Sequence, residues 1–202
     1  MSPADAGRVV APPILHHVTM KTTRLAAMIE WYGAVAGMRV NFQDAVGAWM
    51  TNDGANHRIA LLAIPGLYDD PEKRYRTGMH HAAFEYPTFE DLMATYARLR
   101  DAGIAPAFCL DHGLTTSLYY SDPDANVVEL QVDNFRDWQQ STQWMRTAPE
   151  FRNNPIGVFF DPERVYRTHQ SGLPAKELQK KVFAGEFAPA SPPDLGIGPP
   201  PP

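Results

Sequence analysis

The sequence is poor in cysteine, in long apolar runs and in excess positive charge, and each absence excludes a class of protein. A single cysteine, Cys109, cannot form an internal disulfide, so we expect a reducing compartment and a cytoplasmic location. No run of roughly 18 apolar residues occurs, so we expect no membrane-spanning helix. The formal net charge of −5 gives no reason to expect nucleic acid or an anionic membrane as a partner. Residues 1–13 lack the basic and apolar regions of a signal peptide, so secretion is not expected.

What is present is one order of elements that occurs twice. The apolar patterns predict a strand at 14–21, a helix from Leu25 to Val35 capped by Thr22 or Thr23, and strands at 38–44, 47–51 and 57–64. The order then begins again, with a strand at 79–86, a helix at 88–101 capped by Thr88, and strands at 106–110, 115–121 and 126–132. His17 and His81 are 64 residues apart, and so are Tyr32 and Tyr96. This common offset favours an internal duplication.

The duplication predicts an α+β fold of two modules, at about residues 14–66 and 78–134. Each half is too small to bury a curved sheet alone, so we expect the halves to pack as one domain over residues 14–135. Residues 1–13 are expected to be a flexible arm and residues 136–187 a helical C-terminal extension. Residues 188–202 are rich in proline and are expected to form an extended tail, because proline cannot join helix or sheet hydrogen bonding.

Three residues on predicted strands have the side chains of a metal site. Glu129 is an acid in an otherwise apolar strand, on the face opposite the packed one, and a buried carboxylate without a partner is costly. Neighbouring side chains in a strand face opposite ways, so only one histidine of the pair His16–His17 and one of the pair His80–His81 can join a common site. The duplication selects His17 and His81, because they occupy matching positions of the two halves. Two histidines and a carboxylate are the ligand set that leaves open positions on a non-haem Fe(II). The alternative is a solvated Glu129 with histidines that only form hydrogen bonds.

Three segments carry a resemblance to a known family: residues 15–18, residues 78–84 and residues 118–130, the last specific in its tyrosines, turn and carboxylate. Over about residues 14–135 the sequence resembles the vicinal oxygen chelate superfamily. Within it, the sequence is similar to single-domain type I extradiol dioxygenases of the 2,3-dihydroxybiphenyl 1,2-dioxygenase type. The resemblance implies two βαβββ modules packed as one unit with a curved, partly open mixed sheet, followed by a helical tail. It also implies that His17, His81 and Glu129 hold Fe(II), with Mn(II) as the alternative ion.

The resemblance further implies residues that act beside the metal. His57 matches an active-site histidine that handles the protons of substrate and oxygen, His112 a histidine near the catechol oxygens, and Tyr119 a tyrosine that hydrogen-bonds one of them. The alternatives are a solvent-exposed His57 at a strand end, a His112 in a polar turn and a Tyr119 in the core. Apolar residues expected to line an aryl pocket, but otherwise ordinary core residues, are Phe42, Trp49, Phe84, Phe108 and Phe135.

The predicted strand at 59–64 has no donor side chain, although glyoxalase- and epimerase-like relatives take a further ligand there. This absence favours an Fe(II)-dependent extradiol dioxygenase that opens a catechol-type ring with O₂, with His57 as acid and base. The expected partners are a small catechol-type substrate, O₂ and a second copy of the chain in a homodimer. The alternatives are a metal-dependent isomerase or lyase of the glyoxalase or epimerase kind, and a non-catalytic ligand-binding protein on the same fold.

Overall fold

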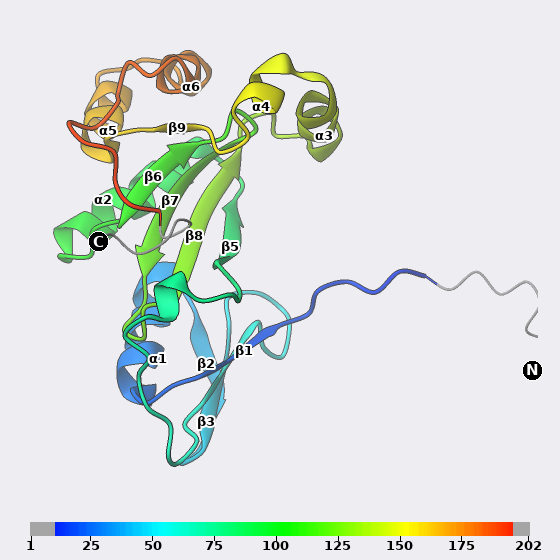
Figure 1. The fold of residues 1–202 in the computed structure, drawn as a ribbon, viewed down its shortest axis with the longest axis vertical. Helices are drawn as coiled ribbons and strands as arrows, with labels where there is room; N and C mark the ends of the chain where they lie inside the picture. The colour runs from blue at the N-terminus through cyan, green and yellow to red at the C-terminus, as the bar shows by residue number, and fades with distance from the viewer. Residues whose placement is uncertain (1–10, 196–202) are drawn as a thin grey trace, which may run out of the picture.

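The computed structural model describes residues 11–195, so the predictions for residues 1–10 and 196–202 lie outside the described residues. Two βαβββ modules follow one another along the chain (Figure 1), which confirms the predicted fold. The first module contains β1 (Val18–Lys21), α1 (Leu25–Ala36), β2 (Arg39–Gln43), β3 (Gly47–Thr51) and β4 (Ile59–Leu62). The second contains β5 (His81–Tyr86), α2 (Phe89–Asp101), β6 (Phe108–Asp111), β7 (Thr115–Ser121) and β8 (Val127–Asp133).

A short 3₁₀ helix, η2 (Lys73–Tyr75), lies between the modules, and mainly helical elements follow the second one. These elements are α3 (Trp138–Thr147), α4 (Pro149–Asn153), β9 (Val158–Phe159), α5 (Pro162–Gln170) and α6 (Ala175–Phe183). No helix within residues 11–195 is long and apolar enough to cross a bilayer.

The strands form two mixed sheets, in the orders β1-β4-β3-β2 and β5-β8-β7-β6-β9. In each sheet the first strand of the module pairs in parallel with the last strand, and so β1 and β5 each lie at a sheet edge. Among the described strands, none pairs across from one sheet to the other. The C-terminal extension adds β9 beside β6 in the second sheet. The two predicted modules are therefore present, but their strands do not form one continuous hydrogen-bonded sheet.

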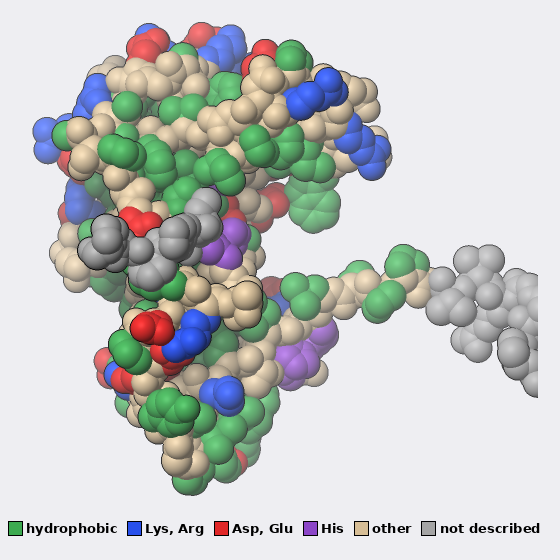
Figure 2. Space-filling view, in the orientation of Figure 1, with side chains coloured by type: hydrophobic (Ala, Val, Ile, Leu, Met, Phe, Trp, Pro, Cys, Tyr) green, Lys and Arg blue, Asp and Glu red, His purple; other side chains and the backbone are tan. Residues whose placement is uncertain are grey.

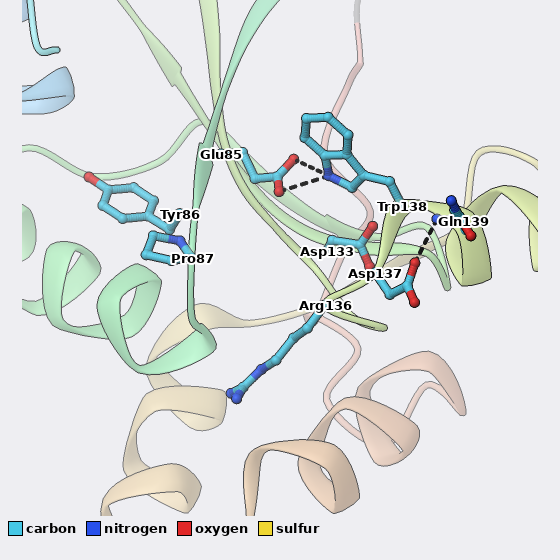
Figure 3. A pocket seen from close by; sticks show the side chains of 8 residues that line it. All are labelled: Glu85, Tyr86, Pro87, Asp133, Arg136, Asp137, Trp138 and Gln139. Atoms are coloured by element: carbon cyan, nitrogen blue, oxygen red, sulfur yellow. Dashed lines mark hydrogen bonds between the residues drawn. The ribbon is translucent and has the colours of Figure 1, made fainter. Parts of the chain in front are cut away.

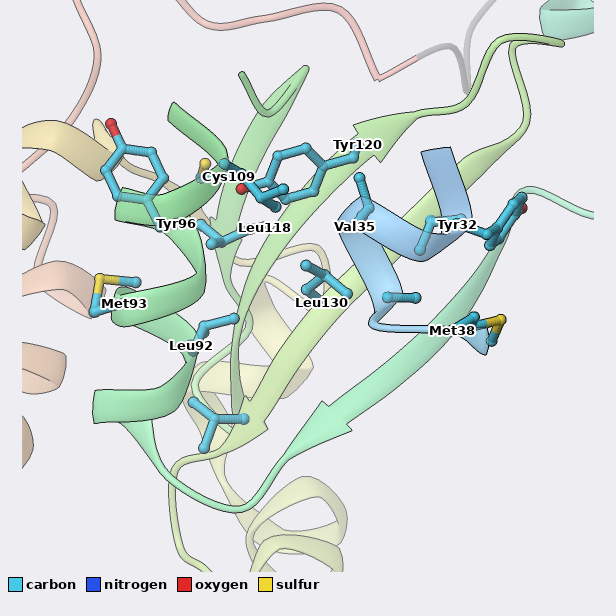
Figure 4. Close-up of a cluster of buried hydrophobic side chains, with 14 of the residues drawn as sticks. Tyr32, Val35, Met38, Leu92, Met93, Tyr96, Cys109, Leu118, Tyr120 and Leu130 are labelled. Carbon is cyan, nitrogen blue, oxygen red and sulfur yellow. The ribbon is translucent and has the colours of Figure 1, made fainter. Parts of the chain in front are cut away.

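One hydrophobic core joins the two modules. Tyr32 and Val35 of α1 belong to the same buried cluster as Leu118, Tyr120 and Leu130 of the second sheet (Figure 4). Full burial of one such apolar side chain stabilises the fold by about 1.5–3 kcal/mol. The shared core therefore fixes the first module against the second.

The ends of the two module helices show where local signals succeeded and where they failed. The Thr88 side chain accepts a hydrogen bond from the backbone N–H of Asp91 and caps α2, as predicted. The predicted threonine cap of α1 is wrong: the N-cap residue is Arg24, whose side chain makes no capping hydrogen bond. Thr22 instead accepts a hydrogen bond from the Arg24 N–H at 2.9 Å, which turns the chain just before the helix.

Candidate functional site

Four of the predicted site residues are joined by hydrogen bonds on the second sheet. Nε2 of His81 lies 3.0 Å from Oε2 of Glu129. The Tyr119 hydroxyl donates a hydrogen bond to Oε1 of Glu129 at 2.9 Å. Nε2 of His112 lies 2.8 Å from the same hydroxyl. We call these four side chains the carboxylate cluster.

Strand register brings the carboxylate cluster together. In β8, Val128, Leu130 and Val132 are buried in the core, so Glu129 faces the other side of the sheet, as the alternation predicted. Glu129 pairs with Tyr119 on β7 and with Ala83 on β5, and neighbouring residues in a register share a face. His81 lies two residues before Ala83 and therefore has the same facing.

The surroundings of the carboxylate cluster fix its charges. Burial would raise the pKa of Glu129, but hydrogen bonds from His81, Ser117 and Tyr119 and the nearby His81 charge outweigh burial and lower that pKa below its usual range. Burial and the adjacent Glu129 carboxylate raise the pKa of Tyr119. Burial also lowers the pKa of His112. Near neutral pH, Glu129 is therefore a carboxylate, Tyr119 a protonated phenol and His112 a neutral imidazole.

His81 and Glu129 fit adjacent positions around a divalent ion. Two donors that lie about 2.1 Å from one ion, at right angles to each other, are about 3.0 Å apart. The 3.0 Å between His81 Nε2 and Glu129 Oε2 has this spacing. An imidazole and a carboxylate are also donors that non-haem iron accepts. The pair supplies two ligands, and a third donor is needed for the predicted set.

The other two predicted histidines, His17 and His57, lie with His16 on the first module. Ligand atoms of His16, His17 and His57 all lie within 4.8 Å of one another, and the rings of His17 and His57 are 4.2 Å apart between centroids. Burial and the neighbouring His17 and His16 lower the pKa of His57. We call these three side chains the histidine cluster. It is the one group of three or more potential metal ligands that the described residues bring within this distance, so His17 does not converge with His81 and Glu129 in one chain.

One member of the carboxylate cluster and two members of the histidine cluster line a common open groove. The groove has a volume of about 700 Å³, and both His17 and His81 line it. In Figure 2 the histidines appear as two separate patches, one on each module. The predicted metal triad is therefore divided between the two modules.

The two histidine pairs are not arranged as expected. Neighbouring side chains were predicted to face opposite ways, but Nδ1 of His80 lies 2.7 Å from Nδ1 of His81, and the Nδ1 atoms of His16 and His17 are 3.1 Å apart. The physical reason is that β5 begins at His81 and β1 at Val18, so the strand alternation does not extend to the preceding residues. The sequence analysis therefore missed His16 as a member of the histidine cluster and the contact of His80 with His81, and no sequence signal located these strand boundaries.

The predicted aryl residues do not line a single pocket. Phe108 stacks on the Tyr119 ring at 4.4 Å and is the one that adjoins the carboxylate cluster. Phe84 lines the groove and packs against the core. Phe42 and Trp49 form a ring pair on the first sheet, whereas Phe135 contacts Trp144 in the C-terminal extension.

A second hollow, between the end of β5 and the start of α3, contains none of the predicted site residues (Figure 3). In it the indole N–H of Trp138 donates to both oxygens of Glu85, at 3.0 and 3.2 Å. This contact connects the C-terminal extension to the second sheet, and we assign the hollow no chemistry.

Known proteins share both the sequence and the fold. Residues 14–130 match the family model described as Glyoxalase/Bleomycin resistance protein/Dioxygenase superfamily. The chain is 38% identical over 184 residues to Biphenyl-2,3-diol 1,2-dioxygenase 2 of Rhodococcus globerulus, which covers 91% of this chain and 96% of that protein. It is 40% identical over 173 residues to Biphenyl-2,3-diol 1,2-dioxygenase 3 of the same organism, covering 85% of this chain and 90% of that protein.

Two further similarities are more partial. Catechol-2,3-dioxygenase of Bacillus subtilis (strain 168) is 32% identical over 120 residues, which span 59% of this chain and 41% of that protein. The crystal structure of a glyoxylase/bleomycin resistance protein/dioxygenase domain from Frankia sp. EAN1pec superposes with a TM-score of 0.51. That match is 22% identical and covers 61% of this chain and 93% of that domain, so it supports the fold alone.

Proposed function

Because the chain belongs to the glyoxalase/bleomycin resistance protein/dioxygenase superfamily, we propose that it is an extradiol dioxygenase that opens the diol ring of a biphenyl-2,3-diol or a related catechol with O₂. Its relatives include two biphenyl-2,3-diol 1,2-dioxygenases of similar length and a catechol-2,3-dioxygenase, which support the ring-cleaving activity predicted from the sequence. The single structural observation that carries the proposal is the carboxylate cluster, in which a tyrosine and a histidine adjoin a metal-ligating pair.

We propose Fe(II) as the ion, with Mn(II) as the alternative, held by His81, Glu129 and His17. The first two have the spacing of adjacent ligands, and the third lies across the groove. Bound Fe(II) would supply the centre at which the diol and O₂ react.

The protein residues would position the substrate and move its protons. Tyr119, held between Glu129 and His112, presents a protonated hydroxyl that can hydrogen-bond a diol oxygen. His57 has a lowered pKa and so is neutral near neutral pH, which suits a base that accepts the diol proton and returns it as an acid. The buried apolar group of Phe108 and Leu110 beside Tyr119 excludes water from this face of the sheet.

The main rival is an isomerase or lyase in which a further protein ligand occupies the metal. In the second sheet, Glu129 of β8 pairs with Ala83 of β5. The equivalent pair in the first sheet joins Ala60 of β4 to Thr19 of β1. Ala60 therefore occupies the position that Glu129 has in the second module. Alanine cannot ligate a metal. This favours a site with open positions for a diol and O₂, as the sequence analysis expected.

Anaerobic loading with Fe(II), followed by O₂ and a panel of catechols that includes biphenyl-2,3-diol, tests the proposal. We expect oxygen uptake together with a yellow ring-fission product. Zn(II)-loaded protein is the matched control and should consume no oxygen. If iron binds but no diol in the panel triggers oxygen uptake, the dioxygenase proposal fails, and this result would favour the isomerase or lyase alternative.

A further inference from the structure

We propose that the C-terminal extension positions His112 beside Tyr119, with Asn154 and Ile156 as the residues that orient the imidazole. This role rests on the proposed function and deepens it, because it assigns a task at the site to a segment beyond residues 14–130, which match the family model. The segment is the connection between α4 and β9, here called the 154–157 loop.

The first observation is that the second module itself contacts only one of the two ring nitrogens of His112. His112 lies in the turn between β6 and β7, where its backbone N–H donates to the Thr115 carbonyl at 2.9 Å. On the ring, Nε2 lies 2.8 Å from the Tyr119 hydroxyl. This contact does not decide which ring nitrogen carries the proton, because a hydroxyl can donate as well as accept. The second ring nitrogen therefore decides the tautomer.

The second observation is that the 154–157 loop supplies a partner for this nitrogen. The Ile156 backbone forms a hydrogen bond with His112 that favours the protonated ring and raises its pKa against the effect of burial. A backbone group that favours the protonated ring is a carbonyl, which accepts. Because Nε2 faces Tyr119, the donor to this carbonyl is Nδ1. The neutral imidazole then carries its proton on Nδ1 and is an acceptor at Nε2.

This tautomer gives the Tyr119 hydroxyl two acceptors for a single proton. Oε1 of Glu129 lies 2.9 Å from the hydroxyl and Nε2 of His112 lies 2.8 Å from it. One of the two acceptors therefore always lacks a donor, and an acceptor left unpaired in a part-buried site is unfavourable. A diol hydroxyl that binds beside Tyr119 would supply the missing donor, so the oriented His112 favours the binding of a diol at this position.

The third observation is that the extension packs against the His112 turn so closely that only glycine fits on either side. Gly157 has a φ of 91°, and a Cβ there would overlap the Asp111 carbonyl and the Cα of His112. Gly113 has a φ of 81°, and a Cβ there would overlap the Trp144 ring of α3. Both backbone conformations are strained for any other residue. The turn is therefore held between two parts of the extension.

The fourth observation is that polar side chains of the extension hold both sides of this contact. The Asn154 amide donates to the Gly157 carbonyl at 2.7 Å, and its Oδ1 accepts the Gly157 N–H at 3.1 Å. This reciprocal pair closes the 154–157 loop and fixes the peptide groups within it. From α6, Gln179 donates to Asn134 at 2.8 Å, and Asn134 donates to the Gly113 carbonyl at 3.1 Å.

The tautomer of His112 in the full-length, metal-free protein tests the proposal without iron or oxygen. Long-range ¹H–¹⁵N NMR correlations distinguish a protonated from an unprotonated ring nitrogen, and His112→Gln identifies the His112 signals by their loss. At about pH 7.5 we expect a protonated Nδ1 and an unprotonated Nε2. Asn154→Ala removes the reciprocal pair and should give a mixture of the two tautomers.

Asn153→Ala is the matched control, because Asn153 is the adjacent residue, is exposed and makes no side-chain hydrogen bond with the described residues. This variant should keep the wild-type tautomer. In Fe(II)-loaded protein, kcat/KM for oxygen uptake with the diol should fall about 10-fold in Asn154→Ala and stay unchanged in Asn153→Ala, because misplacement of an orienting group slows the reaction. Matching circular dichroism spectra show that both variants are folded.

Each outcome decides between the two proposals. A wild-type His112 protonated at Nε2 would overturn the positioning role, and so would an Asn154→Ala variant that keeps the wild-type tautomer. An equal change of tautomer in Asn153→Ala would overturn the assignment to Asn154. If the tautomers behave as expected but iron-loaded wild type consumes no oxygen with any diol, the proposed function fails while the orientation of His112 by the extension stands.

Discussion

Tyr119 is the residue on whose side chain the proposed chemistry depends most. It lies between Glu129 and His112, whereas its ring stacks on Phe108. Replacing Tyr119 with phenylalanine keeps the stacking and removes the hydroxyl. We expect kcat of the Fe(II)-loaded enzyme to fall by about 10²-fold or more, the range of general acid–base and orienting groups, with a smaller change in KM. Steady-state oxygen uptake measures both constants.

Tyr120→Phe is the matched control for this variant. The Tyr120 side chain faces the core, and its buried hydroxyl has no hydrogen-bond partner among the described residues. Removing an unpaired buried hydroxyl should leave kcat unchanged. It should either leave the free energy of unfolding unchanged or raise it by up to about 1 kcal/mol. A comparable loss of kcat in both variants would mean that Tyr119 acts through packing and not through its hydroxyl.

At this scale the sequence identified the chemistry of the site better than its contacts. Strand alternation gave the facing of Glu129, and the resemblance gave Tyr119 and His112, which the structure joins by hydrogen bonds. The contacts of His16 and His80 with the adjacent histidines were not predicted, because they depend on where each strand begins. Alternation is a property of extended backbone, and it gives no information one residue outside the strand.

At the scale of elements, the end of β6 contains a carboxylate that burial disfavours. Asp111 is fully buried, and this burial raises its pKa to about 6, although the Gly113 N–H, Thr116 and Asn134 donate to it. A raised carboxyl pKa means that the folded state binds the proton more tightly, so this group lowers the free energy of unfolding as pH rises from about 4 to about 6. The expected penalty above pH 6 is on the order of 3 kcal/mol.

Asp111→Asn should remove this penalty. The side-chain amide of the introduced asparagine can donate to the Thr116 hydroxyl. That hydroxyl can still donate to Oδ1 of Asn134, which lies 2.8 Å from it. We expect urea unfolding to show a larger free energy of unfolding for the variant than for wild type at about pH 7, and a smaller difference at about pH 4.5. Parallel pH profiles for the two proteins would show that Asp111 titrates normally.

Local sequence signals predicted most elements but not their assembly. Thr88 caps α2 as predicted, because a capping signal acts through the nearest backbone groups. The duplication correctly implied equivalent modules. Their separation was not predictable, because equivalence of His17 and His81 says nothing about the distance between two sheets that share no strand pair. Contacts of α1 with the second sheet, over a long sequence separation, set that distance.

At the scale of the whole molecule, we expect the homodimer predicted from the sequence to use the segment at residues 11–17, here called the arm, where Ile14 and Leu15 are exposed. Leu15→Asp places a charge on this apolar arm, so a dimer formed through it should dissociate at lower dilution than the wild-type dimer in sedimentation equilibrium. Tyr68→Asp is the matched control, because Tyr68 is 88% exposed but lies on the loop after β4. Equal dissociation of both variants would point to a general charge effect and not to the arm.

The shared core also predicts how the molecule unfolds. Met28 of α1 is fully buried in the cluster that includes Leu118 and Leu130 of the second sheet. Met28→Ala should lower the free energy of unfolding by about 2–5 kcal/mol. Because the core is common to both modules, hydrogen exchange monitored by mass spectrometry should accelerate by the same factor in the slowest amides of β4 and of β7. Faster exchange confined to the first module would mean that it opens independently, and a module that opens independently could also bring His17 across the groove within one chain.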